Sequence, residues 1–176
     1  VDDFESYTDD EGKRVFDFWT DGWNVDTNGS LVGYEKSPFT EQTIVHGGTK
    51  SMPLSYENTA GAPSSEATLT FEETKDWTTS RVETLSLCFY GAAGNATNVS
   101  LWVKVTDESN KTAKVVFGAA GEDPTALEDP AWTEWNIPLS SFTGVNLASV
   151  KSITIGLGDG TGSGQLYFDD IRLYPA

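Results

Sequence analysis

The stretch ETLSLCFYGAAGNATNVSLWVKVT, residues 83–106, decides the fold class. Apolar and polar residues alternate on both sides of a glycine-containing loop, and this period of two is typical of β-strands with one face toward a core. The apolar positions lie on one face of each run. They are Leu85, Leu87 and Phe89 in the first run and Val99, Leu101, Val103 and Val105 in the second.

Tyr90 and Trp102 fall on the opposite faces of these two runs. The loop GAAGNAT is short, so we expect an antiparallel hairpin in which both rings share one face of one sheet. An aromatic ring on the solvent face of a sheet is usually covered by a loop or used to contact a ligand. Both interpretations of Trp102 stay open at this point.

Similar short runs recur along the chain between turn-forming clusters. They predict an all-β fold, a two-sheet antiparallel β-sandwich, and a single domain over residues 1–176. The other runs are FESY (4–7), VFDFW (15–19), TIVH (43–46), SMPLSY (51–56), EATLTF (66–71), TAKVVF (112–117), EWNIPL (134–139), KSITIGL (151–157) and QLYFDDIRLY (165–174).

The charge excludes several classes of partner. Twenty-seven acidic residues against 11 basic ones give a net charge of −16, so nucleic acids and anionic membranes are not expected as partners. Cys88 is the only cysteine, which rules out an intrachain disulfide. No apolar run reaches the roughly 20 residues of a membrane span, and Val1 does not begin a signal peptide, so we expect an excised or processed module.

Neutral sugars fit this composition, because aromatic rings stack on the C–H faces of pyranoses while polar side chains bind the hydroxyls. Trp102 and Tyr90 are the leading stacking candidates. Further rings lie in or beside expected loops, and three polar side chains are weaker candidates. The rings are Trp23, Tyr34, Tyr56, Trp77 and Trp132, and the polar candidates are Lys104, Asn136 and Arg81. Trp135 and Ile137 alternate toward the expected core.

Catalytic motifs are weak. His46 is the only histidine and no GxSxG occurs, so a serine triad is not expected, and Cys88 lies mid-strand, where we expect an inert thiol. Asp169 and Asp170 are adjacent, and strand parity places them on opposite faces, which argues against a glycosidase pair. The glycine-rich run GDGTGSG is interpreted as a hairpin tip.

Four stretches carry a resemblance to a known family: VDDFES (1–6), IVHGGTKSMPLSY (44–56), WTEWNIPLSSF (132–142) and YFDDIRLYP (167–175). In this order they resemble the family 11 carbohydrate-binding modules and, more broadly, the calcium-containing jelly-roll, galactose-binding-domain-like modules of polysaccharide-degrading enzymes. The resemblance implies a structural calcium ion held by Glu5, Thr49, Lys50 and Asp169, with Asp3 as an additional ligand. Calcium takes six to eight oxygen ligands, which this set can supply in part.

The family binds β-1,4- and mixed-linkage β-glucans in a cleft on its concave sheet, using tyrosine, aspartate and arginine side chains. This sequence departs from it in a long insertion, DFWTDGWNVDTNGSLVGYEKSPFTEQ (17–42), and in the outward Trp102, and the family's tyrosines have no one-to-one match. We expect a secreted, monomeric, non-catalytic module that binds a neutral β-glycan (β-glucan first, xylan or mannan next) beside a linked catalytic domain. The alternatives are a small jelly-roll glycoside hydrolase or polysaccharide lyase, and a surface-adhesion or protein-interaction sandwich.

Overall fold

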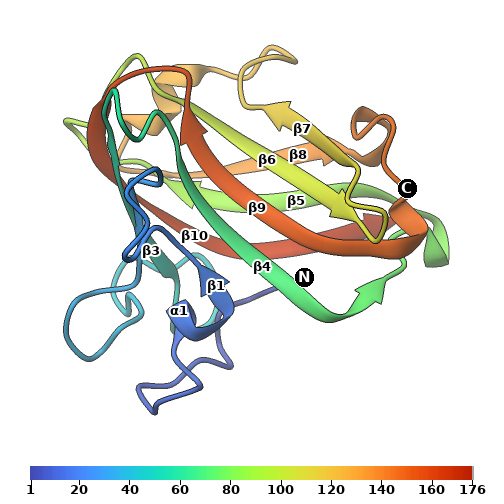
Figure 1. The fold of residues 1–176 in the computed structure, drawn as a ribbon, viewed down its shortest axis with the longest axis horizontal. Helices are drawn as coiled ribbons and strands as arrows, with labels where there is room; N and C mark the ends of the chain where they lie inside the picture. The colour runs from blue at the N-terminus through green and yellow to red at the C-terminus, as the bar shows by residue number, and fades with distance from the viewer. Residues whose placement is uncertain (176) are drawn as a thin grey trace.

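The chain folds into two antiparallel β-sheets packed face to face, as seen in a computed structural model that describes residues 1–175 (Figure 1). The first sheet has the strand order β1-β4-β9-β6-β7 and the second the order β2-β3-β10-β5-β8. The strands are β1 (Trp19–Thr20), β2 (Ser30–Val32), β3 (Met52–Asn58), β4 (Ser65–Lys75), β5 (Val82–Tyr90), β6 (Ser100–Asp107), β7 (Thr112–Val116), β8 (Trp132–Pro138), β9 (Val150–Gly158) and β10 (Gly162–Pro175).

Helical segments are short and lie between the strands. They are α1 (Val15–Phe18), η1 (Thr79–Arg81), η2 (Pro124–Leu127), η3 (Leu139–Ser141) and η4 (Leu147–Ser149). Within residues 1–175, no helix has the length and apolar character needed to cross a membrane. The prediction of an all-β two-sheet sandwich is confirmed.

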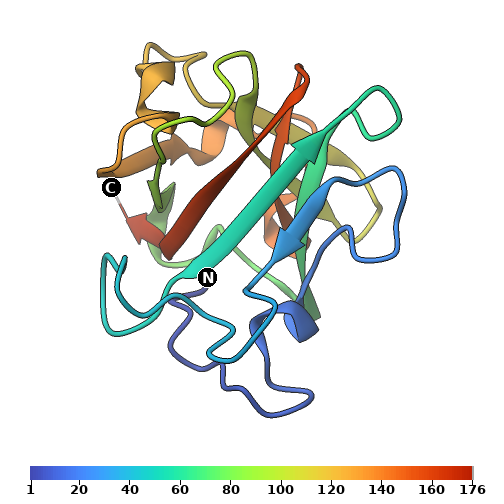
Figure 2. The same cartoon turned by 90° about the vertical axis from the view of Figure 1, so that its left-hand side faces the viewer.

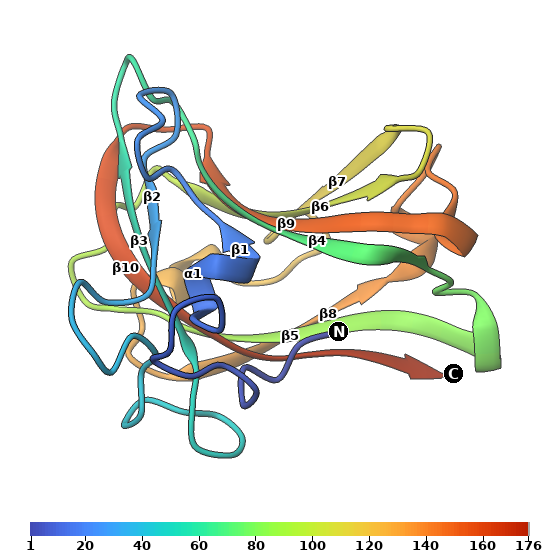
Figure 3. The ribbon, with the colours of Figure 1, turned by 60° about the horizontal axis from the view of Figure 1, so that its bottom comes forward.

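The core lies between the sheets and is built from the apolar positions of the alternating runs. In β5 the inward residues Leu85, Leu87 and Phe89 are fully buried. In β6 and β8 the inward positions, including Trp135 and Ile137, are buried too. Figure 3 shows the two layers, with β4, β9, β6 and β7 in one and β10 curving at the left into the other beside β5.

The predicted hairpin between β5 and β6 is wrong. β5 belongs to the second sheet and β6 to the first, so residues 91–99 cross from one layer to the other. Asn95, which is buried, holds this crossing: its amide nitrogen donates to the carbonyls of Leu127 and Gln165, at 2.7 and 2.9 Å. The connection has nine residues and is longer than the loops of tight hairpins. Its length therefore does not show whether the two strands belong to the same sheet. Tyr90 and Trp102 therefore lie on opposite outer faces of the sandwich.

Two runs predicted as strands are turns or helix because carboxylates bind their backbone N–H groups. Run 15–19 is mostly the helix α1, where the Asp17 side chain accepts the Arg14 N–H at 2.9 Å. Run 43–46 is a turn, since the Glu41 carboxylate accepts the N–H groups of three following residues. The three-residue strand β2 is too short to show an alternation.

Run 4–7 is also a turn, and Phe4 has a positive φ of 58°. The N-terminal segment nevertheless lies beside β10. Asp2 and Ile171 exchange backbone hydrogen bonds of 3.0 and 2.8 Å. In Figure 2, β2, β3 and β10 lie side by side, which brings segments far apart in the sequence into one sheet.

Candidate functional site

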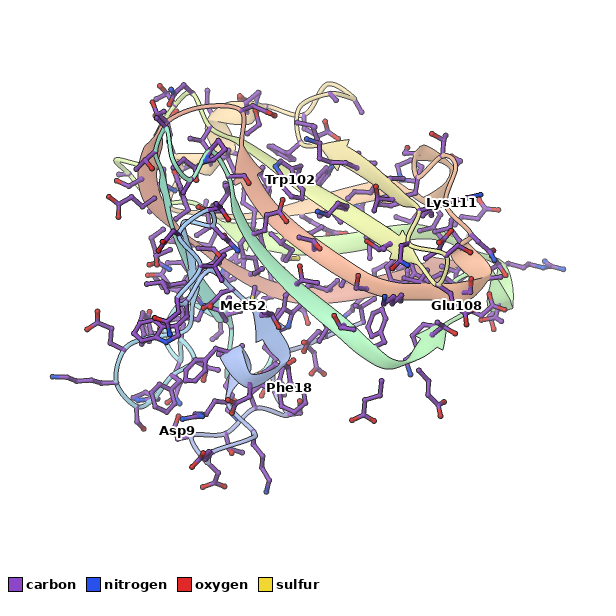
Figure 4. The ribbon with its side chains drawn as sticks, in the orientation of Figure 1. Asp9, Phe18, Met52, Trp102, Glu108 and Lys111 are labelled. Atoms are coloured by element: carbon purple, nitrogen blue, oxygen red, sulfur yellow. The ribbon has the colours of Figure 1, made fainter. Side chains whose placement is uncertain are left out.

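Trp102 lies on the outer face of the first sheet, on β6 (Figure 4). Its register partner on β9 is Gly156. A Cβ atom built on Gly156 would stand 2.2 Å from Cζ2 of the indole, and one on Gly158 would stand 3.2 Å from its Nε1. The two glycines therefore leave the space in which the indole lies against the backbone of the next strand. We call this surface the Trp102 face.

Two lysines cover the other side of the indole. The Lys104 and Lys114 ammonium groups lie 5.3 and 5.1 Å from the ring centroid, within the range of cation–π attraction. Lys104 also pairs with Glu66 at 3.2 Å. The predicted outward direction of Trp102 is correct, but only 3% of the residue is exposed. The ring is accessible to a ligand only when the lysine side chains move aside.

A pocket of about 440 Å³ opens beside this ring. Trp102, Lys114, Glu66 and Asp159 contribute side chains to its lining, and residues 59–60, 63–64 and 158–161 form its walls. The pocket thus combines an aromatic ring with both hydrogen-bond donors and acceptors. That combination suits a ligand with an apolar face and several hydroxyl groups.

A second group of aromatic residues lies on the outer face of the second sheet, which we call the Tyr167 face. Tyr90 on β5 is the register partner of Tyr167 on β10 and of Trp132 on β8. The ring centroids of Tyr90 and Trp132 are 5.5 Å apart and those of Tyr90 and Tyr167 are 6.1 Å apart, both edge to face. All three residues are half-buried.

Polar side chains flank these rings. On β8 and β5, the Glu134 carboxylate accepts hydrogen bonds from Asn136 at 3.0 Å and from Ser86 at 3.3 Å. His46 packs against Trp132 with 5.5 Å between ring centroids, and its Nδ1 lies 2.7 Å from the Asp170 carboxylate. The structure therefore gathers the predicted residues Tyr90, Trp132 and Asn136 on this face.

Tyr34 and Trp23 lie at the β2 edge of the same sheet. Both line an apolar pocket of about 510 Å³ together with Phe16, Leu31 and Phe39. The Tyr34 hydroxyl donates to Glu41. Burial raises the pKa of Tyr34, and hydrogen bonds with Glu41 and Tyr167 act in the same direction. Trp23 is 70% exposed, which makes it the most exposed large hydrophobic side chain among residues 1–175.

Three predicted positions do not belong to either face. Trp77 is 2% exposed and packs with Phe71 in the core, so the prediction of a free loop ring is wrong. Tyr56 is also buried, and its hydroxyl accepts the Ala96 N–H. Arg81 lies in η1, just before β5, whereas Tyr90 ends β5. Each strand residue advances about 3.3 Å, so the length of β5 places Arg81 and Tyr90 too far apart for one sugar-binding subsite.

The expected carboxylate ligands Glu5 and Asp169 both contact one loop, residues 46–50, which contains Thr49 and Lys50. The Glu5 carboxylate accepts the N–H groups of Thr49 and Lys50, each at 2.8 Å. The Asp169 carboxylate, which is fully buried, accepts those of His46 and Gly47 at 2.8 and 3.0 Å. Burial raises the pKa of Asp169 even though these donors act in the opposite direction.

The fit of this loop to a cation is partial. Carboxylate oxygens of the kind that calcium prefers are present, and Asp3 lies next to them in the N-terminal turn, where it accepts the Glu5 N–H at 3.3 Å. However, across residues 1–175 no three His, Cys, Asp or Glu side chains are placed to hold a metal ion together. Backbone carbonyls would have to complete the set.

The prediction that strand parity places Asp169 and Asp170 on opposite faces is wrong, because both carboxylates contact His46. Asp169 pairs with Cys88 and Arg172 with Ser86, so two residues of β10 stand opposite one residue of β5. This is a β-bulge, and Asp170 takes a positive φ of 47° within it. The bulge turns Asp170 toward His46 and sends Ile171 into the core.

The structure brings His46 and Cys88 together, with 3.7 Å between Nε2 and Sγ. Burial and nearby carboxylates, Glu134 first, raise the pKa of the Cys88 thiol to about 12. A thiol with such a pKa carries almost no thiolate at neutral pH, and the thiolate is the nucleophile. The expected inert, buried thiol agrees with this environment.

The protein matches no family model and no curated protein sequence. It does match solved structures. An exo-β-agarase superimposes over 100% of this chain with a TM-score of 0.68 and 10% identity, but this chain spans only 24% of the agarase. A family 30 carbohydrate-binding module gives a TM-score of 0.61 at 14% identity over 85% of this chain and 92% of its own.

The family 11 carbohydrate-binding module from Clostridium thermocellum, in complex with a β-1,3-1,4-mixed-linked tetrasaccharide, gives a TM-score of 0.56 at 18% identity. The match covers 100% of this chain and 94% of that module. These similarities establish that the chain has the jelly-roll sandwich fold of the family 11 and family 30 modules. The resemblance inferred from the sequence is confirmed at the level of the fold.

Several residues of the two faces were not predicted. Tyr167 and Lys114 both occupy outward positions of their alternating runs, which is the signal that could have found them. Whether these side chains lie beside Tyr90 or Trp102 depends on which strands are neighbours in the sheet. Glu66, Glu134 and His46 carry no distinguishing sequence signal.

Proposed function

We propose that this protein is a non-catalytic carbohydrate-binding module that holds a neutral β-glycan on the Trp102 face. The observation that carries the proposal is the indole of Trp102 lying against Gly156 beside a pocket lined by Lys114, Glu66 and Asp159. A pyranose ring would stack on the indole once the lysines move aside, and its hydroxyls would bond to the charged groups around it.

The choice of a neutral polymer follows from charge. A net charge of −16 repels anionic polysaccharides, whereas hydroxyl groups can donate to carboxylates and accept from lysines. β-Glucan is the first candidate and xylan or mannan the next. The mixed-linked tetrasaccharide named for the family 11 structure supports this order.

As a module, the protein would raise the local concentration of a linked catalytic domain at its polysaccharide. The match to about a quarter of an agarase chain supports such an arrangement. We further propose that the module acts outside the cell as a monomeric unit. The carbohydrate-binding modules among the structural matches support a non-catalytic role. A glycan-active enzyme would instead show turnover on a polysaccharide panel in a reducing-end assay, and an adhesion module would capture a protein but no glycan.

Affinity electrophoresis in gels containing β-glucan, xylan, mannan or pectin tests the proposal. We expect the wild type to be retarded by a neutral β-glycan, and Trp102→Ala to lower the affinity of this face about a hundredfold, equivalent to about 2.8 kcal/mol. Phe18→Ala is the matched control, because Phe18 is 45% exposed and lies beside β1, away from Trp102 (Figure 4). Equal retardation of Trp102→Ala and wild type would contradict the proposed binding site on the Trp102 face.

We also propose a structural calcium ion at the loop 46–50, with Glu5 and Asp169 as carboxylate ligands, Thr49 and Lys50 contributing from the loop, and Asp3 nearby. Its support is that both carboxylates already contact this one loop. When bound, the ion would neutralise the buried Asp169 carboxylate and tie the N-terminal turn to β10.

A further inference from the structure

We propose that the Tyr167 face is a second glycan-binding track, separate from the Trp102 face, so that one chain binds two glycan segments at once. This inference rests on the proposed function, because it assigns the same class of ligand to a second surface. It arises from the observation that Tyr90 and Trp102 occupy different sheets.

The track begins as a straight row of rings across neighbouring strands. Trp132, Tyr90 and Tyr167 are register partners on β8, β5 and β10. Pro53 on β3 is the next partner of Tyr167, and its carbonyl accepts the Gly33 N–H at 2.8 Å, one residue before Tyr34. Strands lie about 4.8 Å apart, so the three rings span about 10 Å from β8 to β10. A row of this length suits a short run of sugar units in an extended chain.

Tyr34 connects this row to the apolar pocket at the sheet edge. Its hydroxyl donates to Glu41, and its ring lines the same pocket as Trp23 and Leu31. Leu31 is the register partner of Ser55, and both lie on the outer side of the sheet. Tyr34 and the exposed Trp23 therefore lie at the β2 edge of the sheet whose outer face carries the row.

The side chains beside the row select a neutral, hydroxyl-rich occupant. Glu134, Asp170 and Glu41 place carboxylates along it, which disfavours anionic ligands. Asn136 and the tyrosine hydroxyls provide donors and acceptors suited to sugar hydroxyls. Half-buried tyrosine and tryptophan rings supply apolar contact area with little conformational entropy to lose. An uncharged glycan matches all three properties.

The two faces point away from each other, since they are the outer sides of opposite sheets in the sandwich. A single glycan segment cannot contact both. Two occupied faces would let one protein molecule bridge two polysaccharide chains. Many protein molecules that each bridge two polysaccharide chains would form a network.

Isothermal titration calorimetry with a β-1,3-1,4-linked glucan hexasaccharide tests this inference through stoichiometry, using the whole chain. We expect two hexasaccharides per wild-type chain and one per chain for Trp102→Ala and for Tyr167→Ala. We expect binding to be lost in the double variant. Trp132→Ala gives a second change in the same row should Tyr167→Ala unfold. Tyr174→Ala is the control, because Tyr174 is 43% exposed on β10 but lies outside the row.

Light scattering of the wild type with long mixed-linkage glucan should rise through bridging, and each single variant should abolish the rise. One hexasaccharide per wild-type chain, lost in Trp102→Ala and unchanged in both row variants, would overturn the track and leave the proposed function standing. Failure of the wild type to bind β-glucan, xylan or mannan hexasaccharides would overturn both. Binding that is lost only in the row variants would support the track and contradict glycan binding on the Trp102 face. Capture of a protein by this face, without any glycan, would also overturn the track.

Discussion

The indole of Trp102 and the backbone of Gly156 occupy adjoining strands at a separation that admits no side chain between them: an added Cβ would stand 2.2 Å from the ring. This contact holds the candidate stacking ring down on the sheet. Its strength and its role in binding can be tested without touching the tryptophan.

Gly156→Ala should displace the Trp102 ring and cost about 1–3 kcal/mol of unfolding free energy, the usual price of overpacking. Retardation by β-glucan should weaken in parallel. Gly61→Ala is the matched control, since nothing lies within 4 Å of a Cβ at that position and Gly61 does not line the pocket. Denaturant titration and affinity electrophoresis measure both effects, and a Gly156→Ala protein indistinguishable from wild type would refute the role given to this contact.

Removal of calcium should destabilise the protein. A ligand that binds only the native state raises its stability, so we expect a chelator to lower Tm by several degrees and added calcium to restore it. Glu5→Ala and Asp169→Ala should lose this response. A Tm that is the same with chelator and with calcium would count against the site.

Glu5 should make stability depend on pH. Burial alone would raise the pKa of Glu5, but the hydrogen bonds from Thr49 and Lys50 outweigh it and lower that pKa below its usual 4.5. The contribution is therefore present above about pH 4.5 and lost as the pH falls through the lower folded pKa. In chelator, Glu5→Gln should be less stable than wild type by about 1 kcal/mol at pH 7. The difference should shrink as the pH falls below 4.5; a difference that stays constant as the medium is acidified would exclude the mechanism.

Trp77 and Trp23 should respond in opposite ways to truncation. Trp77 is buried, so Trp77→Ala should cost about 3–5 kcal/mol. Trp23→Ala should leave the unfolding free energy nearly unchanged, because the side chain is 70% exposed. Denaturant titration decides between them, and similar losses in both variants would mean that Trp23 packs as a structural residue.

Cys88 should react slowly with thiol reagents in the native protein. Its thiol is buried, and a pKa of about 12 leaves very little thiolate at pH 8. A chromogenic disulfide reagent should label it quickly only after denaturation. Rapid labelling of native protein, lost in His46→Gln, would instead point to activation by the histidine.

Much of the fold is readable from local pattern. The inward residues of β5 and β6 follow a strict period of two and are buried, although the outward Ser86, Cys88 and Trp102 are buried as well. The strand predictions that were wrong have local causes, which the alternation of apolar and polar residues does not show. Asp17 and Glu41 bind backbone N–H groups that a strand would need, and Asp170 adds a residue to β10.

The candidate sites were less predictable because they depend on which strands are neighbours. The sequence shows that Tyr90 and Trp102 point away from the core, but not that residues 91–99 cross between the sheets. Trp77 and Trp23 are both tryptophans in turn-rich segments, and only tertiary packing separates a core ring from an exposed one. Register likewise joins Tyr167 to Tyr90 across more than seventy positions of sequence.

The place of β10 has a consequence for how the chain is assembled. β10 lies between β3 and β5, yet it follows both along the chain. During synthesis, β3 and β5 therefore keep unpaired edges until β10 has emerged and inserted between them. Unpaired edges invite association with other chains. The order in which the strands leave the ribosome thus makes the second sheet the last part of the molecule to close.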